Sequence, residues 1–158
     1  MGSPPRMSDT MAWRAVLLGL VLISAFCVHG HLSPIRAELR QGKLVLDGAG
    51  PFLGRPTRIA LAEMHDVSWL LYLPPTLERL SGYAAAGRRR GFFVLEELGV
   101  VHLLLDAEEP PFLLVRAHVA SYGEQQLLLR LADAEATREL LAQLELALQA
   151  HDRTRAAE

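Results

Sequence analysis

Three consecutive arginines are the residues of this chain best suited to bind a ligand. Arg88, Arg89 and Arg90 stand in the stretch YAAAGRRRGFF, between an Ala- and Gly-rich segment and two phenylalanines that begin a strand-like run. Planar guanidinium groups match phosphate oxygens, and a loop beside a sheet edge can direct several of them at one anion or at a lipid surface. The competing interpretation is a hydrated turn that protects a strand edge. In both cases we expect three exposed side chains on a loop.

The histidines do not suggest a metal site. His29 and His31 are one residue apart and follow Cys27, but no fourth ligand is near them in the sequence. His102 and His118 could meet across a sheet, although a single His in a strand is more often simply hydrogen-bonded or exposed. We therefore expect no bound metal.

Catalytic patterns are missing as well. Glu96–Glu97 and Glu108–Glu109 are adjacent pairs, and adjacent residues of a strand point to opposite faces, so neither pair is arranged for acid–base work. Ser81 stands in LSGY and not in a Gly-x-Ser-x-Gly elbow, and no glycine-rich loop precedes a helix. We expect no catalytic residue, no cofactor and no enzymatic activity.

Composition excludes two further classes. The chain has 158 residues, about half of them apolar, and a formal net charge of −2, which suits one domain with a real core. That charge, and the lack of a basic stripe interleaved with aromatics, argue against nucleic-acid binding. The single cysteine, Cys27, excludes an internal disulfide.

Residues 15–28 form an uncharged run, the clearest signal near the N-terminus. Counted to Gly30, about 16 helical residues span roughly 24 Å, somewhat less than the hydrocarbon core of a bilayer. Flanking polar side chains and local thinning can accommodate the difference. We therefore expect a disordered tail over residues 1–12 and a transmembrane helix or signal anchor over residues 13–30.

Cleavage near Gly30 is the alternative fate of this segment. Val28 and Gly30 place small residues at the two positions that precede a cleavage before His31. Cleavage would release a secreted or periplasmic protein. For the uncleaved, single-pass form, Arg14 lies next to the run and Arg36 lies eight residues beyond it, so the positive-inside rule favours a domain on the extracytoplasmic side of the cell membrane.

Beyond His31 short apolar runs alternate with turn residues, which is typical of an all-β domain. Residues 35–39 and 43–48 flank a Gln-Gly pair and predict a hairpin. Further runs follow, with a long connection rich in Pro, Ala, Gly and Arg after the second of them: TRIALAEM, DVSWLLYL, GFFVLEE, VVHLLLD, FLLVRAH and QQLLLRL. The pattern predicts about seven or eight antiparallel strands.

One amphipathic helix is expected at the C-terminal end. Asp133 is a plausible N-cap, acidic residues occupy the first turn, and one face is apolar through Leu140, Leu141, Leu144, Ala147 and Leu148. A small barrel needs one open end closed, and a helix with a single leucine face can close it.

The stretches GKLVLDG, TRIALAEMHDVSWL and RRGFFVLEELGVVHLLLDAEEPPFLLVRA, with the closing helix, resemble the bacterial PH-domain families. The resemblance covers roughly residues 34–150 and leaves residues 151–158 as a disordered tail. It implies a PH-like small barrel of about seven strands capped by the helix, and frequent membrane attachment.

The expected function is therefore a single-pass, membrane-anchored PH-like interaction or scaffolding module without catalysis, with an anionic lipid or a protein as its partner. The alternative is a secreted or periplasmic protein that binds a small apolar molecule in a barrel mouth or helix groove.

Overall fold

The structure, a computed structural model, describes residues 13–14, 16–21, 33–48, 57–119 and 123–156. The chain divides into two compact units, Met1–Ser33 and Pro34–Glu158. In the first unit, residues 13–14 and 16–21 are helical. None of the helices in these described ranges has the length and apolar character needed to cross a membrane. The expected tail over residues 1–12, most of the expected anchor and the cleavage position near Gly30 lie outside the described residues.

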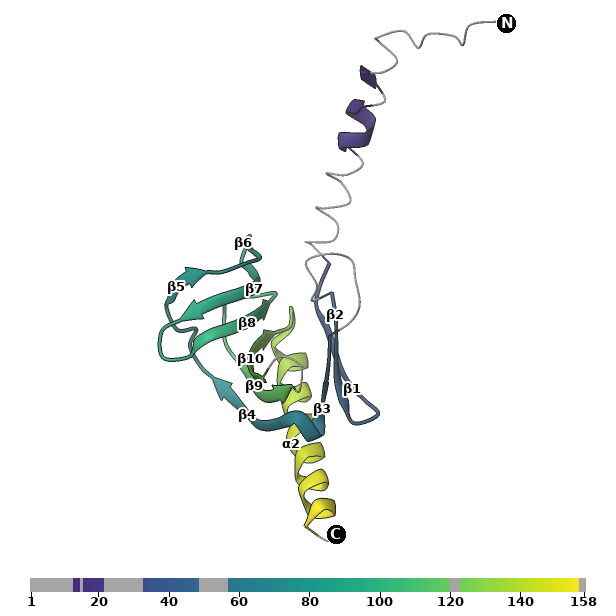
Figure 1. Cartoon of the computed structure of the whole chain (residues 1–158), viewed down its shortest axis with the longest axis vertical. Helices are drawn as coiled ribbons and strands as arrows, with labels where there is room; N and C mark the ends of the chain where they lie inside the picture. The colour runs from purple at the N-terminus through teal and green to yellow at the C-terminus, as the bar shows by residue number, and fades with distance from the viewer. Residues whose placement is uncertain (1–12, 15, 22–32, 49–56, 120–122, 157–158) are drawn as a thin grey trace, which may run out of the picture. The chain divides into compact units, whose positions relative to one another are not determined.

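The described part of the second unit is mainly β and ends in a long helix, as the sequence predicted (Figure 1). A short 3-10 helix, η1 (Leu61–Glu63), precedes the fourth strand, and the C-terminal helix is α2 (Ala134–Arg155). The strands are β1 (Arg36–Arg40), β2 (Lys43–Asp47), β3 (Thr57–Ala60), β4 (Met64–Leu70), β5 (Thr76–Arg79), β6 (Tyr83–Ala85), β7 (Arg88–Leu95), β8 (Gly99–Leu105), β9 (Phe112–Val119) and β10 (Gly123–Arg130).

The smaller sheet contains the predicted hairpin. Strands β1, β2 and β3 pair in that order, all antiparallel. Gln41 and Gly42 connect β1 to β2 with φ of 49° and 69°, and two positive φ values in a two-residue loop are the mark of the type I′ hairpin turn. The hairpin predicted from the Gln-Gly pair is therefore confirmed.

The larger sheet has seven strands, in the order β4-β9-β10-β8-β7-β5, with β6 also paired to β7. β10 lies between β9 and β8; it is antiparallel to β9 but parallel to β8. The expectation of purely antiparallel strands was therefore wrong at this pair. The expected closed barrel is also not found, since within the described ranges no pairing joins β4 to β5 at the two ends of the sheet.

The segment before the arginines is a second hairpin, where the sequence predicted a connection. β6 turns into β7 through Ala86 and Gly87, which have φ of 51° and 73°. Just before β6 the chain crosses β7 so closely that a Cβ on Gly82 would lie 1.9 Å from the carbonyl oxygen of Arg90. A Cβ on Gly91 would lie 2.4 Å from the carbonyl oxygen of Ser81, so this crossing requires glycine on both segments.

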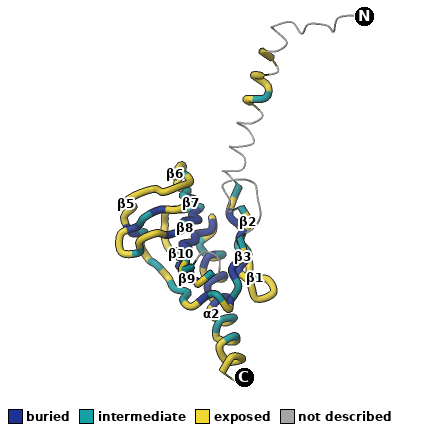
Figure 2. The backbone as a smooth tube through the Cα atoms, in the orientation of Figure 1, coloured by how far each residue is buried: buried dark blue, intermediate teal, exposed yellow. Residues whose placement is uncertain are grey.

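The larger sheet is buried on both faces of its central strands (Figure 2). On β8, Leu104 belongs to a core shared with α2 and the smaller sheet, whereas Leu103 and Leu105 belong to a separate core on the opposite face. We call these the helix-side core and the far-side core. Strands buried on both faces read as continuous apolar runs, which explains VVHLLLD and FLLVRAH.

Helix α2 begins as predicted, because the Asp133 side chain accepts the backbone N–H of Glu135 at 2.9 Å. Its buried Leu140, Leu141 and Leu144 pack into the helix-side core against residues of both sheets. The helix therefore covers a sheet face and does not plug a closed barrel. It also continues to Arg155, so residues 151–155 are helical where a disordered tail was expected.

Candidate functional site

The three arginines lie in strand β7, and the expectation of an exposed loop was wrong. Arg88 and Arg89 are half-buried, and Arg90 is only 5% exposed. The β6–β7 hairpin produces this arrangement, since it makes the arginines cross-strand partners of Tyr83, Ala84 and Ala85. The sequence did not predict strand β6 or the start of β7, because Ala and Gly have little preference for strands.

Arg90 forms a buried ion pair with Asp106, the residue that follows β8. Its Nη2 lies 2.5 Å from Asp106 Oδ1, and the aspartate side chain is completely buried. The other carboxylate oxygen accepts the backbone N–H of Ile35 at 2.6 Å, and Arg90 Nη1 donates to the carbonyl oxygen of Gly48 at 2.8 Å. Ile35 precedes β1 and Gly48 follows β2, so this pair ties the smaller sheet to the larger one.

The other two arginines also have partners within the domain. Arg88 Nε lies 3.9 Å from Asp106 Oδ1. Arg89 Nε donates to Glu108 Oε1 at 2.9 Å, and its Nη1 donates to Thr76 Oγ1 at 3.0 Å. An external anion would therefore compete with carboxylates that already hold these guanidinium groups, and anion binding by the triplet stays a prediction.

His102 and His118 do not meet across the sheet. His102 lies opposite Leu127 on β10, whereas His118 lies opposite Glu124. The His102 ring stacks on Phe92, with ring centroids 4.6 Å apart, and burial lowers its pKa below the ordinary 6.5. We conclude that His102 is a packing residue whose neutral form is favoured by burial.

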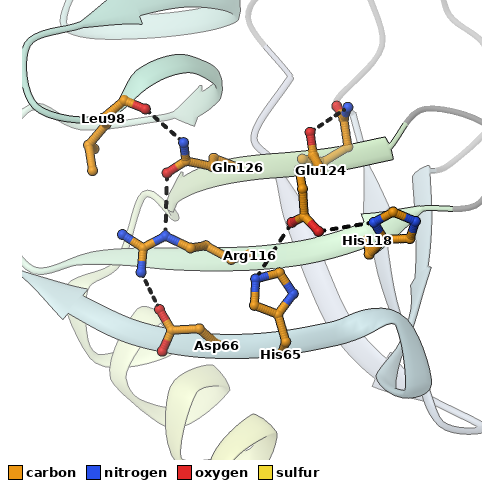
Figure 3. Close-up of polar contacts among 8 residues, drawn as sticks. His65, Asp66, Leu98, Arg116, His118, Glu124 and Gln126 are labelled. Carbon is orange, nitrogen blue, oxygen red and sulfur yellow. Dashed lines mark hydrogen bonds and ion pairs between the residues drawn. The ribbon is translucent and has the colours of Figure 1, made fainter.

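His118 belongs to a polar cluster on β4, β9 and β10 that sequence analysis did not predict (Figure 3). Its Nδ1 lies 3.0 Å from Glu124 Oε1, and His65 Nε2 lies 3.6 Å from the other oxygen of the same carboxylate. Over the described ranges, no group of three His, Cys, Asp or Glu residues is placed to hold a metal ion. Cys27, His29 and His31 lie outside those ranges.

A second chain of polar contacts runs beside it (Figure 3). Arg116 Nη1 donates to Asp66 Oδ2 at 2.5 Å and Arg116 Nε to Gln126 Oε1 at 3.4 Å. Gln126 Nε2 in turn donates to the carbonyl oxygen of Leu98 at 2.7 Å. Arg116 and Gln126 lie on the same sheet face as the far-side core, because each is two residues along its strand from a core residue, Leu114 or Leu128. This face of the sheet therefore changes from apolar to polar along β9 and β10.

Three residues of the two acidic pairs make contacts with different partners. Glu97 accepts the hydroxyl of Tyr72 at 2.7 Å, and this hydrogen bond and the carboxylate charge raise the pKa of Tyr72 above its ordinary 10.0. Glu108 pairs with Arg89, as described above. The backbone carbonyl of Glu109 accepts Arg130 Nε at 2.8 Å. The absence of acid–base catalysis by these residues stays a prediction.

A hollow of about 340 Å³ lies beside the first turns of α2. It is lined by Trp69 and Leu71, by Pro110 and Pro111, which are joined by a cis peptide bond, and by Arg138 of the helix. Trp69 is 36% exposed and Leu71 is 77% exposed, so the hollow presents apolar side chains to solvent. Its walls can take a small apolar group.

Large apolar side chains are also exposed where α2 leaves the larger sheet uncovered. Phe92 pairs with His102 across β7 and β8, and Val94 pairs with Val100. Phe92 is 39% and Val100 53% exposed, and Leu80, whose N–H donates to the carbonyl oxygen of Phe92, is 50% exposed. We call Leu80, Phe92 and Val100 the apolar strip.

Comparisons with protein-family models, with curated proteins and with solved structures find no match to this chain.

Proposed function

We propose that this chain is a single-pass, membrane-anchored interaction module without catalytic activity. The observation that carries the proposal is the position of the folded unit, which begins at Pro34, six residues after the uncharged run of residues 15–28 ends. A folded unit placed so close to an apolar segment is held near the bilayer when that segment is inserted. The proposal includes an extracytoplasmic position for the domain, which is supported by Arg14 next to the uncharged run and Arg36 eight residues beyond it.

The PH-like character of the domain belongs to the same proposal. A mainly β unit whose last element is a helix packed through one leucine face supports it, although the larger sheet is open. The proposed role is to hold a partner at the membrane. The apolar strip supports a protein partner, because an exposed cluster of large apolar side chains is typical of interaction surfaces.

The anchor is tested on the native protein. Membranes from the producing cell are washed with alkaline carbonate, which removes peripheral proteins, and the chain is then analysed by mass spectrometry. We expect the chain in the pellet with its Trp13 peptide intact. A chain found in the soluble fraction with His31 as its first residue would refute the anchor.

The hollow beside α2 favours a second candidate function. In this alternative, cleavage near Gly30 releases a secreted or periplasmic protein that binds a small apolar molecule between Trp69, Leu71 and the two prolines. Trp69 then reports binding directly, because an apolar ligand at its ring changes its fluorescence. Titration with a short fatty acid should change the tryptophan emission of the cleaved protein, in which Trp69 is the one tryptophan left. An unchanged spectrum would remove this candidate.

A further inference from the structure

The outer face of the smaller sheet is rich in basic side chains. Leu44, Leu46 and Ile59 face the helix-side core, so by alternation their neighbours in β1, β2 and β3 face outward. The outward residues include four exposed basic residues, which we call the basic face: Arg36, Arg40, Lys43 and Arg58.

Among the described residues, three of these four cations have no carboxylate within ion-pair distance. Arg40 Nε pairs with Glu38 at 2.8 Å. Asp47, which lies opposite Arg36, instead accepts the backbone N–H of Gly48 at 2.9 Å. Across the described ranges no carboxylate lies within 4.0 Å of Arg36, Lys43 or Arg58. They differ in this from the arginines of β7, each of which has a carboxylate within 4.0 Å.

The basic face stands out against an acidic domain. Leaving out Arg6, Arg14 and Asp9, the chain's 16 basic and 18 acidic residues become 14 and 17 from Pro34 onward. The basic face holds four of those basic residues, accompanied by only two acidic ones, Glu38 and Asp47. The rest of the unit therefore has ten basic residues against fifteen acidic ones, and an anionic surface would attract one side of the domain and repel the remainder.

The same face is close in sequence to the proposed anchor. Arg36 follows Val28 by eight residues, which span at most about 29 Å when fully extended. A tether of this length keeps the basic face at a high effective concentration over the bilayer surface. Weak electrostatic contacts then suffice to dock it.

We propose that the basic face docks on anionic phospholipid headgroups of the bilayer that holds the N-terminal segment. This inference rests on the proposed anchoring. A lipid surface fits better than a protein, because the charges spread over three strands around the half-buried Val45, and headgroups can adjust to such spacing. Each basic residue near an anionic membrane contributes about 1 kcal/mol, so removing the three unpaired cations should shift the docking equilibrium roughly a hundredfold.

The test uses the full chain reconstituted in lipid nanodiscs. Cys27→Ser and Val45→Cys leave one thiol at the centre of the face, which carries a polarity-sensitive dye. We expect a blue shift of the dye in nanodiscs of phosphatidylcholine mixed with phosphatidylglycerol and none in phosphatidylcholine alone. The shift should vanish in about 1 M salt, where the screening length falls to about 3 Å. A second dye position, at the exposed Leu146 of α2, should not respond.

Two charge variants with the same change in net charge decide between a local and a general effect. Alanine at Arg36, Lys43 and Arg58 should abolish the shift, whereas alanine at three basic residues of α2 should preserve it: Arg138, Arg153 and Arg155. A similar loss in both variants, or the same dye emission in both lipids, would overturn the docking proposal. Reconstitution tests the anchor separately. A chain that does not co-purify with nanodiscs of either lipid would contradict the proposed membrane anchor, whatever the charge variants show.

Discussion

Replacing Arg90 by alanine should destabilise the domain strongly, although the residue was expected to be a surface charge. The substitution leaves the Asp106 carboxylate fully buried, with the N–H of Ile35 as a neutral donor at 2.6 Å and the Nε of Arg88 at 3.9 Å. It also removes the hydrogen bond to the carbonyl oxygen of Gly48. Both losses fall on the contacts that join the smaller sheet to the larger one.

The magnitude follows from what remains around Asp106. Breaking a buried ion pair by removing one partner costs about 3–5 kcal/mol. Arg88 already lies near the carboxylate and can approach it, so we expect the lower end, about 3 kcal/mol. For a domain of this size, that corresponds to a fall in Tm of roughly 10 °C.

The measurement is urea unfolding of the purified chain in a mild detergent, followed by far-UV circular dichroism. The matched control is Arg89→Ala, one residue earlier in the same strand; its partner Glu108 is 46% exposed, so this pair should be worth no more than about 1 kcal/mol. A double variant, Arg90→Met with Asp106→Leu, should recover much of the loss, because it removes both charges. Equal midpoints for Arg90→Ala and Arg89→Ala would refute the conclusion that the buried Arg90–Asp106 ion pair joins the two sheets.

The remaining predictions concern the crossing, the helix and the stacked histidine. Gly91→Ala should prevent folding or cost at least about 3 kcal/mol, because its Cβ would lie 2.4 Å from the Ser81 carbonyl oxygen; a near-parental Tm would contradict this. Leu144→Ala should cost about 2–5 kcal/mol and the 67% exposed Leu146→Ala less than about 0.5 kcal/mol, and similar thermal midpoints would show that α2 is not packed as described. His102 has a folded pKa below its ordinary 6.5, so the unfolded chain binds the proton more readily and stability should fall as pH drops below 6.5. His102→Gln should remove that part of the pH dependence in unfolding at pH 7.5 and pH 5, and an unaltered pH profile would exclude His102 as its source.

Local signals in the sequence predicted much of this fold. Gln41 and Gly42 set a hairpin turn, Asp133 caps α2, and the apolar runs of β7 to β10 are strands. Each of these depends on residues within a few positions of one another. The parallel pairing of β10 with β8 could not be predicted in that way, because the β9–β10 hairpin is compatible with β8 on either side of it.

The arginine triplet shows the same limit for site residues. Charge and the neighbouring glycines suggested a solvated loop, but the state of Arg90 is set by Asp106, Gly48 and Ile35, which lie far from it in the chain. Neither these partners nor their burial can be inferred from the triplet itself. The glycine at position 91 was informative, but for a close crossing of two segments and not for a flexible turn.

The position of β10 has a consequence for biosynthesis. Strand β10, which is synthesised after the other nine described strands, fills the centre of the larger sheet and supplies Leu127 and Leu129 to one core and Leu128 to the other. A nascent chain that has reached Val119 holds β8 and β9 with their future pairing edges open and both apolar faces incomplete. Unpaired edges and exposed apolar faces are what drive aggregation. A truncation before residue 123 should therefore yield an insoluble or degraded product and not a smaller working domain, because β8 and β9 depend on β10 for their pairing.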